Sequence, residues 1–167
     1  MEDNENKVIY IGVSDHLPKL PKYFSELDAG IEVDFKKYKL NISNILSIDL
    51  DTELLDKRII ELEKMISNDG QIVTKYTLKT NILVDLKIKC MTSNDLSMVR
   101  IVHEKFIKSI MISLPDKEKD IDTKKLFKQN RLKLETYVED IYCELYNNKM
   151  NCQIAIFINC NFVNINN

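Results

Sequence analysis

Residues 76–90 read YTLKTNILVDLKIKC, and this stretch decides the fold. Its even-numbered positions, from Tyr76 to Cys90, are mostly apolar, whereas its odd-numbered positions carry mostly Lys, Asn, Asp or Thr. Successive side chains of a strand point to opposite faces, so a long run with a period of two fits a strand and does not fit a helix. The stretch therefore predicts one long strand that is buried on its even-numbered face.

Three further long strands are predicted toward the C-terminus, over residues 98–114, 132–146 and 150–165. Each is rich in β-branched and aromatic residues and is bounded by turn-forming stretches. Within 132–146 the apolar residues change parity, which predicts a β-bulge near Glu139 and Asp140. The connections are expected to be turns at 93–95 and 147–148 and a short helix over 123–127.

The N-terminal part of the chain gives a weaker pattern. A short strand over 8–13 is expected to lead into an irregular connection over 14–30, which contains two prolines. Residues 31–40 alternate at their start. Residues 41–50 are ambiguous and fit a single helical turn after Ser43 or Asn44. Residues 57–66 fit either an amphipathic helix or a strand that enters a turn at 68–70.

Long strands joined by short turns predict a mostly β fold, namely an antiparallel two-layer β-sandwich-like domain with minor helical segments. The predicted organisation is an N-terminal strand and irregular extension over residues 1–30, followed by the β domain over residues 31–167. A chain of 167 residues is long enough for one domain with a real core.

Composition narrows the classes of partner. The formal net charge is −2, and the 24 basic and 26 acidic residues are interspersed, so no nucleic-acid partner is predicted. No apolar run approaches the roughly 20 residues of a spanning helix, so no membrane insertion is predicted either. The acidic N-terminus lacks the basic and apolar regions of a secretory signal peptide, so we expect a protein made in the cytoplasm.

The sequence offers no recognisable catalytic motif. It lacks GxGxxG, Walker, HExxH and GxSxG patterns, and its three glycines cannot form a phosphate-cradling loop. We therefore predict no catalytic residue and no cofactor. A metal site is also not predicted, because the four cysteines and two histidines do not have zinc-ligand spacing. His103 is expected to lie on a strand surface beside Ile101 and Lys105.

Acidic and aromatic residues are densest in the strand over 132–146. Paired carboxylates serve glycosidic chemistry, but on a strand we favour a solvated sheet face for Glu135, Glu139, Asp140 and Glu144. Three tyrosines flank them and form a candidate interaction surface that suits either sugar binding or protein packing. These are Tyr137, Tyr142 and Tyr146.

The cysteines are predicted to be free thiols, as in a reducing compartment. Cys152 and Cys160 share a strand face but lie too far apart to bridge one another. Cys152 is expected in the core. Cys90, beside a turn, and Cys160, near the C-terminus, are expected to be accessible, which makes them candidates for an intermolecular disulfide.

Four stretches resemble the SPOCS domain of spore-forming Firmicutes, and the first two are FKKYKLNISNILSIDLDTELLDKRIIELEKM, at 35–65, and GQIVTKYTLKTNILVDLKIKCM, at 70–91. In VRIVHEKFIKSIMISLP, at 99–115, five residues match the histidine–phenylalanine strand of that family, namely His103, Phe106, Ile112, Leu114 and Pro115. In LETYVEDIYCELYNNKMNCQIAIFINCNFV, at 134–163, the run Tyr137 to Tyr142 matches its acidic strand. The resemblance extends over about residues 31–165 and favours a strand over 57–66.

The resemblance implies a non-enzymatic structural or morphogenetic protein of the spore envelope. Such a protein acts by self-association or by docking to coat and exosporium proteins. It is made in the mother-cell cytoplasm and ends in the spore coat or exosporium. The alternative is a carbohydrate-binding β-sandwich module that contacts spore or cell-wall glycan through the tyrosines.

Overall fold

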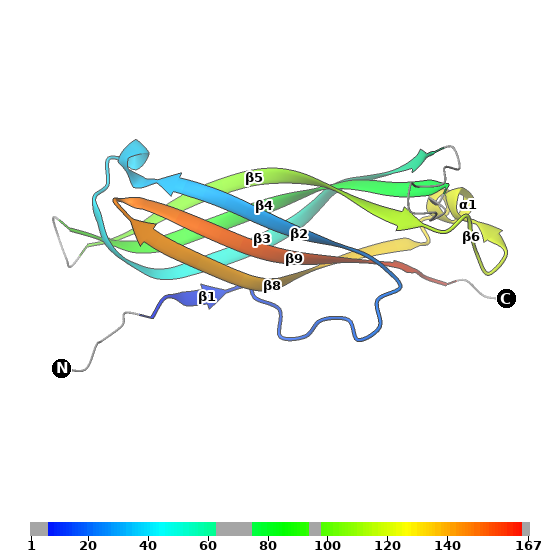
Figure 1. Ribbon diagram of the computed structural model, residues 1–167, viewed down its shortest axis with the longest axis horizontal. Helices are drawn as coiled ribbons and strands as arrows, with labels where there is room; N and C mark the ends of the chain where they lie inside the picture. Colours follow the sequence, from blue (N-terminus) through cyan, green and yellow to red (C-terminus); the bar gives the residue numbers. More distant parts are fainter. Residues whose placement is uncertain (1–6, 63–74, 94–97, 165–167) are drawn as a thin grey trace, which may run out of the picture.

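Two β-sheets pack face to face in the computed structural model, which describes residues 7–62, 75–93 and 98–164. Figure 1 shows the smaller sheet lying across the larger one. The larger sheet has the order β1 (Ile9–Ile11), β3 (Ile42–Glu61), β4 (Tyr76–Thr92), β5 (Val99–Leu114). The smaller sheet has the order β2 (Tyr23–Asp34), β9 (Lys149–Phe162), β8 (Leu132–Tyr146). The prediction of a mostly β, sandwich-like fold with minor helix is confirmed.

Strand β4 contains the stretch that decides the fold, and it lies between β3 and β5. All of its even-numbered residues from Tyr76 to Cys90 are buried, as the alternation predicted. They face the inward side chains of β9, among them Ile154, Ile156 and Ile158, within one hydrophobic core. Burial of this face contributes strongly to folding, because each large apolar side chain contributes about 1.5–3 kcal/mol.

The hairpin of β8 and β9 matches its prediction in detail. Asn147 and Asn148 have φ angles of 49° and 63°, the left-handed pair that a two-residue hairpin turn requires. The register between the strands shifts between Val138 and Asp140, so the predicted bulge is present. Because of that bulge, even-numbered residues face the core before it and odd-numbered residues face the core after it.

The irregular connection predicted over 14–30 is wrong from residue 23 onward. Residues Tyr23–Asp34 form β2, which pairs with β9 along its whole length. The inward positions of β2 include the small residues Ser25 and Ala29, which weakened the apolar alternation in the sequence. The strand also continues through residue 30, where a boundary between an extension and the β domain was expected.

Residues 41–50 were ambiguous in the sequence, and the single helical turn that they fitted after Ser43 or Asn44 does not form. These residues begin β3, and the short 3-10 helix η1 lies earlier, at Phe35–Tyr38. Register shifts after Ile42 and Ile45 break the alternation there, which is why the pattern resembled a helix. Residues 57–61 belong to β3, as the resemblance favoured. The turn predicted at 68–70 and most of that predicted at 93–95 lie outside the described residues.

Strand β1 runs parallel to β3 and places the N-terminal segment beside the other sheet. Just after β1, the Ser14 N–H donates to the Val138 carbonyl at 2.8 Å, and the Val138 N–H donates to Ser14 Oγ at 3.0 Å. Gly12 makes this path possible, because its φ is 102° and a Cβ there would collide with the Leu50 carbonyl. The N-terminal segment therefore joins the edges of β3 and β8.

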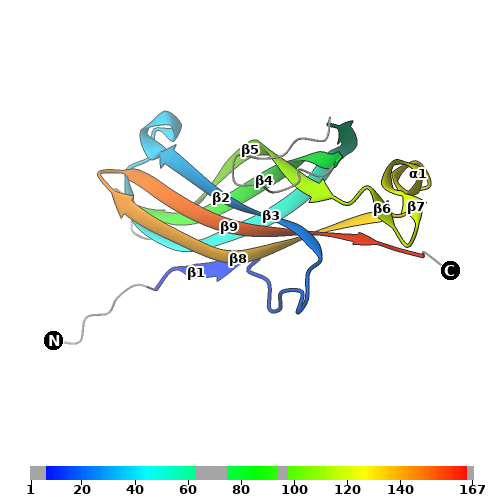
Figure 2. The ribbon, with the colours of Figure 1, turned by 45° about the vertical axis from the view of Figure 1, so that its right-hand side comes forward.

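The predicted short helix is confirmed as α1 (Thr123–Lys128), whose N-cap Asp122 accepts from the Lys125 N–H at 3.1 Å. A small ribbon of β6 (Lys117–Glu118) and β7 (Ile121–Asp122) precedes it at one end of the sandwich (Figure 2). No helix in the described part of the chain is long and apolar enough to cross a membrane.

Candidate functional site

The three predicted tyrosines all lie on the outer face of the smaller sheet. The bulge in β8 brings Tyr137 to the same face as Tyr142 and Tyr146, although their numbers differ in parity. Tyr142 and Tyr146 are exposed by 56% and 73%, respectively. Tyr137 is half-buried, and its ring lies 6.4 Å from that of Phe157. The tyrosines therefore share a face but do not form one continuous platform.

A shallow hollow lies beside Tyr142 on this face. The ladder places Asp28, Ala155 and Asp140 side by side across the three strands, with Gln153 and Tyr142 in the neighbouring row. The hollow measures about 260 Å³, and the small side chain of Ala155 leaves room for it. Two carboxylates, an amide and an exposed ring are the groups that hydrogen-bond and stack on a polar ring such as a sugar.

The carboxylates of this strand have ordinary partners rather than one another. Glu135 forms an ion pair with Lys133 at 2.8 Å, which lowers the pKa of Glu135. Glu144 accepts a hydrogen bond from the Tyr142 hydroxyl. Glu139, at the bulge, has a raised pKa because it is partly desolvated and lies near Glu26 and Asp28. Among the described residues, no two of these carboxylates bond to each other, and no pair is arranged as a general acid and a nucleophile.

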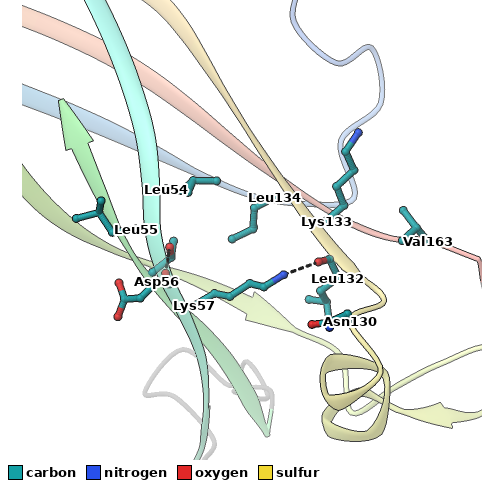
Figure 3. Close-up of a pocket in the computed structure, with 10 residues that line it drawn as sticks. Leu54, Leu55, Asp56, Lys57, Asn130, Leu132, Lys133, Leu134 and Val163 are labelled. Atoms are coloured by element: carbon teal, nitrogen blue, oxygen red, sulfur yellow. Dashed lines mark hydrogen bonds between the residues drawn. The ribbon is translucent and has the colours of Figure 1, made fainter. Parts of the chain in front are cut away.

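A second concavity opens between the edges of the two sheets. Figure 3 shows Lys57 of β3 reaching across the gap, where its ammonium donates to the Leu132 carbonyl of β8 at 3.1 Å. The cleft measures about 520 Å³, and its walls are mostly apolar side chains of the two strands, such as Leu54 and Leu134. Elsewhere along the same two strands, the hydroxyls of Thr52 and Thr136 are 2.9 Å apart.

The accessibility expected for Cys90 and Cys160 is wrong. Both thiols are fully buried. Burial raises the pKa of Cys90 and raises that of Cys160 to about 12, so neither thiol is a ready nucleophile in the folded protein. Cys160 precedes the end of β9 by two residues, and its inward parity decides its burial more than its nearness to the C-terminus does.

The expectation that all four thiols are free is also corrected. Cys143 of β8 and Cys152 of β9 lie directly opposite each other and are joined by a disulfide, with their Cα atoms 4.2 Å apart. Such a short Cα separation is that of a cross-strand pair without hydrogen bonds between its two residues. The sequence put Cys152 in the core, which is correct, but it gave no register that would have shown Cys143 as its neighbour.

Metal ligands do not gather in the described residues. Within residues 7–62, 75–93 and 98–164, no three His, Cys, Asp or Glu side chains are placed to hold a metal ion. His103 lies exposed on the outer face of β5, on the same side as Ile101 and Lys105, as the alternation predicted.

Sequence reasoning missed the hollow and the cleft. Asp28 lies in the first part of β2, which was not recognised as a strand, and the cleft depends on how the edges of two sheets approach. The one usable signal was Ala155, a rare small residue at an outward position of a strand rich in large side chains.

Comparison with known proteins adds no relative: no family model, no curated protein and no solved structure matches this chain. The similarity to the SPOCS family therefore stays a prediction that rests on the sequence motifs.

Proposed function

We propose that this protein is a non-enzymatic structural component of a bacterial spore envelope, which assembles with itself or docks onto coat and exosporium proteins. Its destination would be the coat or exosporium, reached from the mother-cell cytoplasm. The motifs shared with the SPOCS family support the spore envelope as the place. One structural observation supports assembly as the mode of action, namely a group of exposed apolar side chains on strand β5.

That group consists of four residues on one face of β5, which we call the β5 apolar stripe: Val99, Ile101, Ile107 and Met111. Ile101 is 61% exposed, and Ile107 and Met111 are each 58% exposed. Single exposed apolar residues are common on any surface, but several on one strand mark a site of protein contact. Burying the stripe against a partner removes apolar area from water, which favours association.

Co-sedimentation with purified coat and exosporium layers tests this function. We expect the wild-type protein to pellet with one of these layers, and we expect an Ile101→Thr/Ile107→Thr variant to pellet much less. A Leu20→Thr variant is the matched control, because it removes an exposed apolar side chain that lies outside both sheets. Failure of the folded wild type to pellet with any layer contradicts the proposal. A hydrolytic activity that Glu139→Gln abolishes contradicts its non-enzymatic part.

A carbohydrate-binding role is the second candidate, and the hollow beside Tyr142 favours it. If glycan binds there, pelleting with insoluble spore or cell-wall glycan is lost in Tyr142→Ala and in Gln153→Ala. It is kept in the β5 variant Ile101→Thr/Ile107→Thr. The opposite pattern of losses supports assembly through β5.

A further inference from the structure

Strand β5 forms one edge of the larger sheet, and its free side can be identified from the hydrogen bonds of β4. Odd-numbered backbone groups at the two ends of β4 point toward β3: the Lys75 carbonyl accepts from Leu62, and the Ser93 N–H donates to Asn41. In its middle, the Asn81 N–H donates to Asp56 Oδ1. Even-numbered residues of β4 therefore bond β5, and they pair with even-numbered residues there. The odd-numbered residues of β5 direct their N–H and C=O groups outward.

Strand β2 approaches this edge, but within the described residues no further strand bonds the outward backbone groups of β5. The Tyr38 hydroxyl lies 3.4 Å from the His103 carbonyl. Strand β2 is the nearest strand of the other sheet, yet no backbone hydrogen bond joins β2 to β5 among the described residues. In Figures 1 and 2, β5 forms the upper margin of the sandwich over its middle part.

The edge lacks two features that prevent strand pairing, but it carries charged residues, among them Glu104 and Lys108 on the face toward the other sheet. It has no proline between Val99 and Leu114, and its ladder with β4 has no bulge. The side chains of its odd-numbered residues lie on the outer face of the sheet, and they include the β5 apolar stripe. A long and regular edge of this kind is a template for a strand that pairs with its charged residues.

We propose that a second copy of this chain pairs with the edge, β5 to β5 and antiparallel, about a two-fold axis at Phe106. This inference rests on the self-association in the proposed function and names its surface. The two four-stranded sheets then form one continuous sheet. Ile101 of each copy lies opposite Met111 of the other, so these two residues of each β5 apolar stripe pack beside one another across the axis, whereas Ile107 lies opposite Lys105.

Charge selects this register. With Phe106 on the axis, Glu104 of each copy lies opposite Lys108 of the other, which gives two pairs of opposite charges. These are positions without hydrogen bonds between the paired residues, where side chains are closest. Moving the axis to Lys105 places two lysines face to face. Moving it to Ile107 places both Glu104 and Lys108 opposite apolar residues. The self-complementary charges are the argument for a second copy as the occupant.

Glu104 remains able to form this pair. Its Oε1 atom accepts the Tyr38 hydroxyl at 2.5 Å, and its Oε2 atom is available to the second copy's lysine. Lys108 is exposed, and within the described residues it forms no ion pair. In the dimer the Ser109 N–H of the second copy replaces or joins the Tyr38 hydroxyl at the His103 carbonyl.

Charge exchange tests the register. Sedimentation velocity is measured over a concentration series for the wild type, Glu104→Lys, Lys108→Glu and the variant with both substitutions. We expect a dimer for the wild type, association at least tenfold weaker for each single variant, and recovery to within about threefold in the double variant. Lys87→Glu, on the exposed face of β4, is the matched control and should associate as the wild type does. Circular dichroism establishes that each variant is folded.

Three results overturn the inference: a wild type that stays monomeric, single variants that associate normally, or a double variant that does not recover. Its failure is distinguishable from failure of the proposed function. A monomeric Glu104→Lys protein that still pellets with spore layers leaves the function standing without this dimer as its basis. A wild-type dimer that pellets with no spore layer leaves the dimer standing and contradicts the function.

Discussion

The edges of β8 and β5 differ in how the chain covers them. Strand β8 has backbone groups bonded at three places by residues from elsewhere, through Lys57, Ser14 and the Tyr10 hydroxyl, which accepts from the Cys143 N–H at 3.2 Å. Strand β5 has the Tyr38 hydroxyl at His103. The N-terminal segment thus bonds one edge and does not reach the other. Because the chain covers the edge of one sheet with its own residues, the edge that it leaves uncovered is a site to test for assembly.

Strands β5 and β8 pack on the same hydrophobic core, so a charge placed in that core should lower the stability of both edges and have the largest effect. Val84→Asp buries a charge at a fully buried position of β4. We expect the free energy of unfolding to fall by at least about 4 kcal/mol, which is enough to unfold a marginally stable domain. Urea denaturation followed by circular dichroism measures this. Lys89→Glu, on the exposed face of the same strand, should cost less than about 1 kcal/mol. A cooperatively folded Val84→Asp protein would show that the register is wrong.

Loss of the disulfide should have the second largest effect on stability. It acts on only one of the two edges, because it joins β8 to β9 and does not involve β5. Reduction of the Cys143–Cys152 bond opens a loop of sequence separation 9, which should lower the free energy of unfolding by about 2–3 kcal/mol. Urea curves with and without reductant measure the change, and alkylation with mass spectrometry counts the thiols. Before unfolding, Cys90 and Cys160 should not react. An unchanged urea midpoint on full reduction, or rapid labelling of Cys160, contradicts this prediction.

The N-terminal cover of β8 has a smaller expected effect. Ser14→Ala removes the hydroxyl that accepts from the Val138 N–H, and Val138 is buried. We expect a loss of about 1–3 kcal/mol and faster amide hydrogen exchange at Val138. Ser109→Ala on β5 is the control, because its hydroxyl bonds Asn81 at an exposed site, and it should change stability by less than about 0.5 kcal/mol. Equal effects of Ser14→Ala and Ser109→Ala would show that the contact between Ser14 and β8 does not stabilise the fold.

The hydrogen bond between Tyr38 and Glu104 of β5 is measured by titration of the Tyr38 hydroxyl. The Glu104 carboxylate accepts the Tyr38 hydroxyl and raises the pKa of Tyr38 to about 12, since the phenolate would face a carboxylate. A raised pKa means that this hydrogen bond supports the fold below about pH 10 and is lost as the pH rises through about 12. Absorbance at about 295 nm should show a late-titrating component, and Glu104→Gln should move the contribution of Tyr38 toward a pKa of about 10. Glu53→Gln should leave it unchanged. A wild type without a late-titrating tyrosine contradicts the prediction.

The sequence predicted elements whose pattern is local. The buried face of β4, the Asn147-Asn148 turn and the bulge near Glu139 each follow from alternation or from turn residues within a few positions. The first part of β2, residues 23–30, was missed because Ser25 and Ala29 dilute its inward face, whereas the alternation from Ile31 was recognised. The start of β3 was ambiguous in the sequence because its register shifts twice.

The candidate sites depend on which strands become neighbours, and that limits prediction from sequence. The partnership of Cys143 with Cys152 follows from the register of β8 on β9, and the Ser14 cover follows from a parallel pairing of β1 with a strand some forty positions away. The hollow needs Asp28 and Asp140 on either side of β9. Tyr142 and Tyr146 were located correctly on a surface because their strand was recognised.

The pairing of β2 with β9 has a consequence for synthesis on the ribosome. Strand β2 ends at residue 34 and β9 begins at residue 149, so the partner of an early strand is the last strand to be made. At about 5–20 residues per second, β2 waits roughly 6–25 seconds for that partner. During this interval its apolar residues are unpaired and open to other nascent chains. The acidic residues at alternate positions of β2, Glu26, Asp28 and Glu32, repel such neighbours until β9 arrives.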